Sequence, residues 1–354
     1  MAEGAGTVSR SPRVDTTSGA PPDWDAFVAR HPLASAYHRA AAVEIGARAF
    51  GLRTMFLAAR DERSRVIGVL PLVEQSSALF GRFLTSLPFV TYGGILAEDP
   101  SVAAALALQA AALARRRRAD HLELRHTAPL AAAGFAERLD KVSMILPLPD
   151  SEAALLKQLG SKLRSQIRRA EREPVEIVWG GAERLRDFYP IFAATMHELG
   201  TPVYPRRFFQ IAYDALHDVA SILIVRLRGE AQAGAILVRH GRRIEVPWAA
   251  ATPVAKRLSV NMRMYSELLR FAVAGGAEAF DFGRSTIDSG TYRFKAQWGA
   301  QPQQLHWHYW LRGAAAIPKL NSSNPRYARA VALWRRMPLW CVNLLGPHIA
   351  RHLP

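Results

Sequence analysis

Phe280-Asp281-Phe282-Gly283-Arg284-Ser285, followed by Tyr292-Arg293-Phe294-Lys295-Ala296-Gln297-Trp298-Gly299, is the stretch that decides how this chain is interpreted. Its first part alternates apolar and polar residues as a strand does, and its second part predicts a loop that places Lys295 among aromatic residues. A lysine among aromatic rings is partly desolvated, which suits either a catalyst with a shifted pKa or a clamp for an anion. The alternative is a surface lysine whose aliphatic stem covers apolar neighbours.

The strand before this loop ends a series of elements that occurs twice. In each half, two apolar runs around a polar turn predict a β-hairpin, followed by a strand, a helix and an alternating strand. In the first half these segments are residues 55–59, 66–70, 89–94, 102–116 and 121–125. In the second half they are residues 222–225, 233–237, 244–249, 259–274 and 279–283. The repeat predicts a duplicated domain, and a coincidence of common α/β order is the alternative.

A basic amphipathic segment joins the two copies. Its apolar stripe at helical spacing predicts one helix over residues 151–172, which ends before Pro174. The other faces carry the cations Lys157, Lys162, Arg164, Arg168, Arg169 and Arg172. This density of unpaired cations favours contact with phosphate groups, and a merely solvated helix face is the alternative.

Composition limits the classes of protein that the chain can belong to. Its 354 residues, 49% of them hydrophobic, suffice for two ordinary domains, and residues 1–22 are predicted to be a disordered leader. A net charge of +16 indicates an anionic partner, unless it only reflects an arginine-rich composition. The single cysteine, Cys341, excludes an intrachain disulfide and a cysteine-based zinc site. Without a signal peptide or a long apolar run, we expect a cytoplasmic protein.

Three motifs give the chain a resemblance to a known family, the Fem-type tandem-GNAT acyltransferases. They are the basic stretch 161–171, the strand end Phe280-Asp281-Phe282-Gly283-Arg284, and Phe294-Lys295 followed by Trp298-Gly299, which is similar to the family's Phe-Lys…Phe-Gly pattern. The resemblance covers roughly residues 23–312. More narrowly, the chain resembles the branch associated with exosortase and exopolysaccharide gene clusters.

The resemblance implies an α/β (α+β) fold of two tandem GNAT-like domains, each a twisted mixed sheet flanked by helices. The expected organisation is an N-terminal domain over residues 23–150, a C-terminal domain over 151–312, and a tail over 313–354. The tail mixes tryptophan and leucine with cations, so it is expected either to dock on the body or to face a membrane. The protein would then lie at the inner face of that membrane.

The family also implies an activity, which is the transfer of an acyl or aminoacyl group to an amine on a cell-envelope precursor. The donor is a co-substrate, aminoacyl-tRNA or acyl-CoA, and no other cofactor or metal is expected. The acceptor is a nucleotide-linked or lipid-linked glycan precursor. Lys295 is the counterpart of a family lysine that stabilises the developing oxyanion or the tRNA end, a role that suits a cation in a water-poor cleft.

Further residues are candidates for the same site. Asp281 is a second catalytic candidate, because alternation along the strand places it on the same face as Gly283. It can orient Arg284 or accept a proton from the attacking amine. The alternative is an ordinary carboxylate at the end of a strand. The candidate substrate-binding residues are Lys162, Arg164, Arg168, Arg169, Tyr204, Asn261, Arg284, Tyr292, Arg293 and Trp298. Asn261 opens a predicted helix and is either an anion contact or a cap.

Some features depart from this family or allow other functions. The chain lacks the long two-helix arm of some Fem-type members and the glycine-rich pyrophosphate signature of acetyl-CoA-dependent GNAT enzymes. His306 and His308 share a strand face, but a packed aromatic strand is favoured over a metal site. The rival functions are acyl-CoA-dependent transfer to a sugar amine and a non-catalytic basic adaptor that binds RNA or a membrane.

Overall fold

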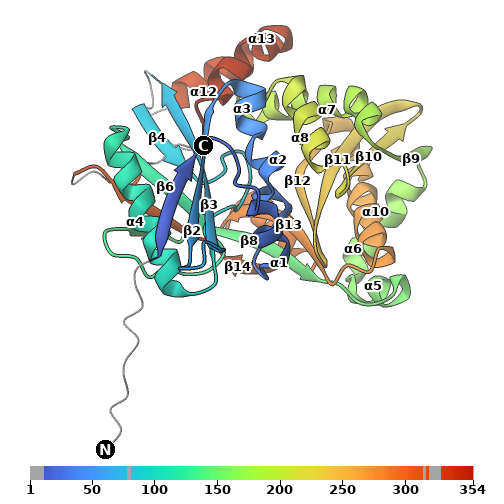
Figure 1. Cartoon of the computed structure of the whole chain (residues 1–354). Helices are drawn as coiled ribbons and strands as arrows, with labels where there is room; N and C mark the ends of the chain where they lie inside the picture. The colour runs from blue at the N-terminus through green and yellow to red at the C-terminus, as the bar shows by residue number, and fades with distance from the viewer. Residues whose placement is uncertain (1–11, 78–80, 314–315, 319–327, 354) are drawn as a thin grey trace, which may run out of the picture.

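The computed structural model describes residues 12–77, 81–313, 316–318 and 328–353. Two twisted β-sheets lie side by side and are flanked by helices (Figure 1). Helix α4 covers one sheet, and helices α6 and α10 cover the other. This arrangement is the pair of mixed sheets that the repeat predicted.

Sheet A follows the order β1-β2-β3-β4-β6-β15-β7, with the short β5 paired to β3. Its strands are β1 Arg13–Thr17, β2 Arg53–Arg60, β3 Val66–Ser77, β4 Gly81–Thr85, β5 Leu96–Ala97, β6 His121–His126, β7 Ala136–Arg138 and β15 His306–Leu311. All neighbours are antiparallel except β4 and β6, which run parallel. The predicted hairpin in the first half is therefore β2 and β3.

Sheet B follows the order β9-β10-β11-β12-β13-β8-β14. Its strands are β8 Lys141–Pro147, β9 Val175–Gly180, β10 Ala220–Leu227, β11 Glu230–His240, β12 Arg243–Ala251, β13 Ala279–Thr286 and β14 Gln301–Gln304. Here the only parallel pair among the described strands is β12 with β13. Each position in this sheet therefore has its counterpart in sheet A.

The two sheets exchange one strand. Strand β8 follows β7 in the chain but pairs with β13 and β14 in sheet B. Strand β15 follows β14 but pairs with β6 and β7 in sheet A. The proposed division of the chain at residue 150 stays a prediction, and each sheet takes one strand from the other side of it.

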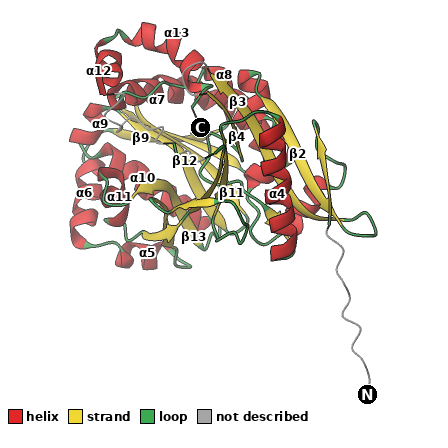
Figure 2. Cartoon of the chain, turned by 90° about the vertical axis from the view of Figure 1, so that its left-hand side faces the viewer, coloured by secondary structure: helices red, strands yellow, loops and turns green. Residues whose placement is uncertain are grey.

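Helices fill the space around and between the sheets. In the first half they are α1 Trp24–Arg30, η1 Ala36–His38, α2 Ala40–Val43, α3 Ile45–Phe50 and α4 Pro100–Arg116. In the second half and the tail they are α5 Glu152–Gln158, α6 Ser161–Glu171, η2 Ala182–Arg184, α7 Leu185–Leu199, α8 Arg206–Leu216, α9 Pro253–Arg257, α10 Val260–Ala274, α11 Gly290–Ala296, α12 Ala328–Arg336 and α13 Leu339–Ala350. Figure 2 shows α4 along one flank and α6 with α10 on the opposite flank.

Both faces of each sheet are buried, which explains the continuous apolar runs of the central strands. Successive side chains of a strand point to opposite faces. In β10, Ile222 and Ile224 enter the core between the two halves, whereas Leu223 and Val225 pack under α10. In β2, Phe56 joins the shared core and its neighbours pack under α4. The shared core makes the two halves one packed unit.

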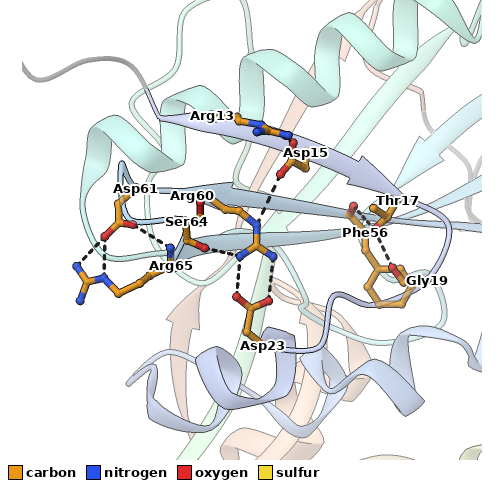
Figure 3. A network of polar contacts seen from close by, with 10 residues as sticks. All are labelled: Arg13, Asp15, Thr17, Gly19, Asp23, Phe56, Arg60, Asp61, Ser64 and Arg65. Carbon is orange, nitrogen blue, oxygen red and sulfur yellow. Dashed lines mark hydrogen bonds and ion pairs between the residues drawn. The ribbon is translucent and has the colours of Figure 1, made fainter.

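The structure corrects the prediction of a disordered leader. Residues 1–11 lie outside the described residues, but β1 pairs with β2 from Arg13 to Thr17. Arg60 of β2 ties this segment down, because its guanidinium contacts the carboxylates of Asp15 and Asp23 at 3.6 and 2.7 Å (Figure 3). The prediction is therefore wrong for the part of the leader that forms this edge strand.

Two predicted elements of regular structure are also wrong. Residues 89–94 form no strand, because Leu87 and Phe89 on either side of Pro88 have positive φ angles of 52° and 74°. The helix predicted over residues 151–172 is two helices, α5 and α6, because Leu159 and Gly160 adopt extended backbone. The apolar stripe continues across this break, which is why periodicity alone did not reveal it.

The C-terminal tail docks on the body of the protein. Helices α12 and α13 pack against α7, and His197 of α7 bonds through Nε2 to the carbonyl oxygen of Trp334 at 3.1 Å. Gln75 of β3 donates to the carbonyl oxygens of Arg351 and Leu353 at 3.2 and 2.9 Å. Both contacts fix the tail across the two halves.

Candidate active site

Lys295 lies on a short helix rather than in the predicted loop. Ser289 caps α11 by accepting a hydrogen bond from the backbone N–H of Tyr292. The helix buries the ammonium group of Lys295, which donates to the carbonyl oxygens of Gly283 and Arg284 at 2.8 and 2.9 Å. Helix α11 and the end of β13 therefore form one unit around this lysine.

The environment of Lys295 shifts its titration toward neutral pH. Burial lowers the pKa of Lys295 to about 8, while the carboxylate of Asp281 acts against this shift and Arg284 reinforces it. The ammonium group has three N–H donors, and the two carbonyls use two of them. One N–H donor is not used by these two carbonyls.

Lys295 contacts β13 at an opening in the strand pairing of sheet B. Strands β12 and β13 pair in parallel only from Arg243 and Ala279 to Glu245 and Asp281, and beyond that point the pairing ends. On its other edge, β13 has a bulge between Asp281 and Arg284, where Gly283 has a φ angle of 76°. A glycine relieves the steric strain that a side chain meets in this backbone region. The bulge also lets two successive carbonyls reach one lysine.

Two buried carboxylates close the inner end of this opening. Glu245 and Asp281 are partners in the parallel register, and neither is exposed to solvent. Asp281 accepts hydrogen bonds from the Ser143 hydroxyl and from the backbone N–H of Gly283. The Tyr92 hydroxyl lies 3.3 Å from its other oxygen, and its single proton serves either Asp281 or Glu245. No contact between Asp281 and the Arg284 guanidinium occurs, so the predicted orienting role for Asp281 toward Arg284 has no support in this geometry.

Glu245 is held by three donors from both halves of the chain. Tyr37 donates to its Oε2 at 2.7 Å, Tyr92 at 3.2 Å and His240 at 3.0 Å. The backbone N–H of Ala36 donates to Nδ1 of His240, which assigns the ring proton to Nε2. Because Tyr37 and Tyr92 come from the first half, the network joins the two halves beside the opening.

The environments of the two carboxyl groups shift their pKa values in opposite directions. Burial raises the pKa of Asp281 to about 6, and the charge of Glu245 adds to this shift. Burial also opposes ionisation of Glu245, but the hydrogen bonds from His240, Tyr37 and Tyr92 outweigh it and lower the pKa of Glu245. The pair therefore favours one negative charge on Glu245 and a proton on Asp281 in mildly acidic solution.

Sequence reasoning missed four members of this network: Tyr37, Tyr92, His240 and Glu245. One signal was present, because Glu245 is the only charged residue in the apolar run Ile244-Glu245-Val246-Pro247-Trp248. A carboxylate inside such a strand must be paired when it is buried. The two tyrosines carry no comparable local signal.

The residues predicted around Lys295 have different environments. Arg284 is exposed, and its guanidinium lies 4.9 Å from the ring centroid of Trp307. Tyr292 is half-buried and Arg293 is exposed on α11. Trp298 is only 1% exposed and packs in the core near Phe282, so its ring surface is not offered to a substrate.

Tyr204 and Asn261 lie on other elements. Tyr204 belongs to an aromatic cluster with Phe89 and Phe208, at ring-centroid distances of 5.4 and 4.6 Å. Burial raises the pKa of Tyr204, and the positive charge of Arg284 opposes that shift. Asn261 is half-buried in the first turn of α10, and its amide contacts the sulfur of Met262.

The basic helix α6 presents most of its predicted cations to solvent. Lys162, Arg168 and Arg169 are exposed, whereas Leu163 and Ile167 pack in the core under sheet B. Arg164 differs, because its guanidinium donates to the carbonyl oxygens of Leu156 and Leu159 at the end of α5. Arg164 thus joins the two helices, and the other three cations remain available for a ligand.

The described residues contain no group of three or more His, Cys, Asp or Glu side chains placed to hold a metal ion. His306 and His308 lie in the strand β15, where His306 contacts Glu137 and His308 contacts His126. Within the same described ranges, no helix has both the length and the apolar character needed to cross a membrane.

Comparisons with known proteins place the chain in a structural class. Residues 158–296 match the family model of the acetyltransferase (GNAT) domain. No curated protein sequence matches the chain. The crystal structure of FemX is similar at a TM-score of 0.64 and 16% identity, covering 90% of this chain and 100% of FemX.

Two further solved structures are similar over most of their length. L-PGS from Bacillus licheniformis has a TM-score of 0.56 and 12% identity, covering 90% of this chain and 98% of that one. A tandem GNAT protein from the clavulanic acid biosynthesis pathway has a TM-score of 0.51 and 12% identity, with 86% and 100% covered. The likeness confirms the predicted fold of two tandem GNAT-like sheets. Within the second half, residues 158–296 match a GNAT acetyltransferase domain, which supports an acyltransferase.

Proposed function

We propose that the chain is an N-acyltransferase that moves an acyl or aminoacyl group to an amine of a cell-envelope or exopolysaccharide precursor. One observation carries this proposal: the buried Lys295, with one N–H donor left over, stands where β12 and β13 separate. A carbonyl carbon bound in that opening would place its oxygen near a fixed cation.

The reaction needs a cation more than it needs a nucleophile on the protein. The acceptor amine attacks the ester or thioester carbonyl, and the tetrahedral intermediate carries a negative oxygen. Lys295 stabilises that oxygen, because a preorganised cation in a water-poor site favours the transition state over the ground state. The intermediate then expels the tRNA hydroxyl or the coenzyme A thiol, and the amine loses its proton.

Asp281 and Glu245 support the charge on Lys295. Both carboxylates raise the pKa of Lys295 and so counter the effect of burial. Asp281 is placed as a positioning residue, because its oxygens are engaged by Ser143, Gly283 and Tyr92. Its pKa near 6 also allows it to take up a proton that arrives through the Tyr92 hydroxyl.

A turnover assay with two donor classes tests the proposal. Purified protein is incubated with aminoacyl-tRNA or with acyl-CoA and a panel of amines, and product is measured by mass spectrometry. Lys295→Met, of similar length without charge, should lose transfer by at least about 100-fold, as for removal of one oxyanion donor. Equal turnover by parent and Lys295→Met would remove Lys295 from the mechanism.

The choice of donor separates the proposal from its rivals. Use of aminoacyl-tRNA supports an aminoacyl transfer like that implied by the Fem-type resemblance, in which the exposed cations of α6 hold phosphates. Use of acyl-CoA supports acyl transfer onto a sugar amine. Binding of RNA with no turnover of any donor supports a non-catalytic adaptor.

The docked tail favours work at a membrane surface. Leu333, Trp340 and Leu344 are 65%, 70% and 64% exposed, although α12 and α13 are packed against α7. Arginines 335, 336 and 351 lie in the same segment, which suits an anionic leaflet. We propose that the protein is cytoplasmic and touches the inner face of the membrane through this tail.

Vesicle sedimentation tests the tail. The double variant Trp340→Glu/Leu344→Glu should lose binding to vesicles that contain phosphatidylglycerol. Leu108→Glu, at a 54% exposed leucine on α4, is the matched control and should bind like the parent. If the double variant and the parent sediment alike, the tail does not contact the membrane.

A further inference from the structure

A cavity of about 270 Å³ opens where the two sheets exchange strands. Its lining comes from β6, β7, β8, β13, β15 and α11, so both halves are needed to form it. Four of the lining side chains are cations: Arg125, Arg138, Lys141 and Arg284. The cavity therefore concentrates positive charge at one place in the fold.

The carboxylates at this place do not balance the cations. Arg125 pairs with Glu123 at 2.6 Å, and Arg138 and Lys141 share Asp140 at 2.7 and 3.1 Å. Arg284 has no carboxylate partner among the described residues. Four cations against two carboxylates leave two positive charges beside one enclosed space.

Arg125, which is paired with Glu123, and Arg284, which has no carboxylate partner among the described residues, contact the same aromatic ring. The guanidinium carbons of Arg125 and Arg284 lie 4.5 and 4.9 Å from the ring centroid of Trp307. Cation–π contact fixes the planes of both groups. An anion bound by Arg284 would meet a restrained donor group, because the fork geometry of arginine matches phosphate oxygens.

Buried polar groups in the lining also lack partners. The hydroxyl of Ser285 and the indole N–H of Trp307 have no hydrogen-bond partner, although the two residues are only 3% and 4% exposed. An unpaired buried polar group is costly and calls for a ligand or a water. Both residues line the cavity, so an oxyanion there could satisfy them.

The cavity adjoins the candidate catalytic lysine. The carbonyl oxygen of Arg284 accepts a hydrogen bond from Lys295, and Thr291 of α11 lies on the cavity wall one turn before that lysine. We propose that the cavity binds the phosphoryl dianion of a substrate, with Arg284 as its principal ligand. This inference depends on the proposed function in one respect, which is that the ligand is a substrate of the transfer reaction.

A dianionic phosphoryl group fits better than a single carboxylate. It matches the excess of two positive charges, and its several oxygens can accept from Arg284, Ser285 and Thr291 together. The diphosphate bridge of nucleotide-linked and lipid-linked precursors carries the same two charges on two adjacent phosphates, and coenzyme A carries both such a bridge and a phosphate monoester. The shared chemistry is the phosphoryl dianion, and the source is decided by experiment.

Titration calorimetry with inorganic pyrophosphate at about 0.15 M salt tests the proposal, because that salt screens the general attraction of a highly basic protein. Arg284→Gln should weaken binding at least about 10-fold, in line with loss of a charge-assisted hydrogen bond. Ser285→Ala should weaken it by a smaller factor. Arg242→Gln removes the same charge from an exposed ion pair with Glu278 and should leave binding unchanged.

Three outcomes overturn the cavity as a phosphoryl site. They are no binding by the parent, equal binding by parent and Arg284→Gln, and equal losses in Arg284→Gln and Arg242→Gln. Repeating the titration with uridine diphosphate, farnesyl diphosphate and coenzyme A then identifies the source of the group. The ligand whose affinity depends most on Arg284 is assigned to the cavity.

Lys295→Met separates this proposal from the proposed function. Its pyrophosphate affinity should fall much less than that of Arg284→Gln, since Lys295 donates only to the backbone carbonyls of Gly283 and Arg284. If transfer depends on Lys295 but the protein does not bind pyrophosphate, the proposed acyltransferase function is supported and the proposed cavity site is wrong. If pyrophosphate binding depends on Arg284 but no donor supports transfer, the proposed cavity site is supported and the proposed acyltransferase function is wrong.

Discussion

At the scale of single residues, the charge of Lys295 sets the pH range of transfer. Its pKa of about 8 lies well below the usual 10.5, mainly because the group is buried. If the cation stabilises the oxyanion, kcat/KM should fall as pH rises through about 8. Lys295→Arg keeps its charge and should lack this alkaline decline at whatever activity it retains. A rise of the parent's kcat/KM through the same range would instead assign the neutral amine as a base.

Asp281→Asn gives the second residue-scale prediction. The pKa of Asp281, about 6, is raised above the usual 3.8 of an aspartate, so the folded chain binds the proton more tightly than the unfolded chain. Stability from this group is therefore full below pH 4 and is lost as pH rises through 6. Asparagine should then increase the free energy of unfolding at pH 7.5 by on the order of 2 kcal/mol, and much less at pH 4.

The same variant links Asp281 to Lys295. Asparagine can keep the contacts to Ser143 and Gly283 through its oxygen and donate to the Tyr92 hydroxyl. It removes a negative charge that raises the pKa of Lys295, so the alkaline limit of activity should move below pH 8. Denaturant unfolding at the two pH values and the pH profile of kcat/KM check both effects. An unchanged alkaline limit would mean that Asp281 does not act on Lys295.

At the scale of elements, the exposed face of α6 predicts how the protein responds to salt. Replacing Lys162, Arg168 and Arg169 by glutamine should reduce the slope of log affinity for tRNA against log salt by about 2–3. Arg164 is left in place, because it joins α6 to α5. A triple variant at the scattered exposed arginines Arg48, Arg116 and Arg242 removes equal charge and should change the slope less. Equal slopes in the two variants would assign the effect to net charge.

The sequence predicted helices and strands well where the spacing of apolar residues kept one period without interruption. The hairpins, α4, α10, β6 and β13 follow apolar runs or stripes whose spacing is unambiguous. The break at Leu159 and Gly160 was missed because the apolar stripe runs through it. The helix around Lys295 was missed although Ser289 is a typical N-cap residue, since a seven-residue helix carries little periodic signal.

The candidate site was predicted only as far as single motifs allow. The Phe-Lys motif identified Lys295, and alternation identified Asp281. Two of the three donors to Glu245, Tyr37 and Tyr92, come from more than 150 positions away, so no window of sequence contains them together with Glu245. Trp298 was predicted as a substrate contact, but its place in the core follows from packing that a motif does not encode.

At the scale of the whole molecule, the exchange of β8 and β15 makes each half depend on the other. Periodicity predicts that β15 is a strand but not which strand it pairs with, because pairing is decided over a separation of about 180 residues. The exchange buries Tyr309 of β15 against Glu123 of β6, with a hydrogen bond of 2.6 Å. It also supplies Ser143 of β8 to Asp281. The candidate site and the contact between the two sheets therefore depend on the same exchanged strands.

This dependence predicts that neither half folds alone. A fragment of residues 1–150 lacks β15, which leaves one edge of β6 unpaired and exposes Glu123 and Arg125, both buried in the whole chain. A fragment of residues 151–354 lacks β8, which separates β13 from β14. Unpaired edges of this length favour aggregation. We expect each fragment to be insoluble or unfolded when it is expressed alone, and the two to purify as one complex when they are expressed together.

Calorimetry of the whole chain tests the same dependence without cutting it. The shared core and the exchanged strands should give one cooperative unfolding transition, with equal calorimetric and van't Hoff enthalpies. Tyr37→Phe, which removes a donor to Glu245 across the halves, should lower the midpoint while keeping a single transition. The matched control is Tyr213→Phe, at a half-buried tyrosine on α8, and it should have a smaller effect. Two resolved transitions, or a soluble folded fragment of either half, would show that the halves are independent domains and that the exchanged strands contribute little to holding them together.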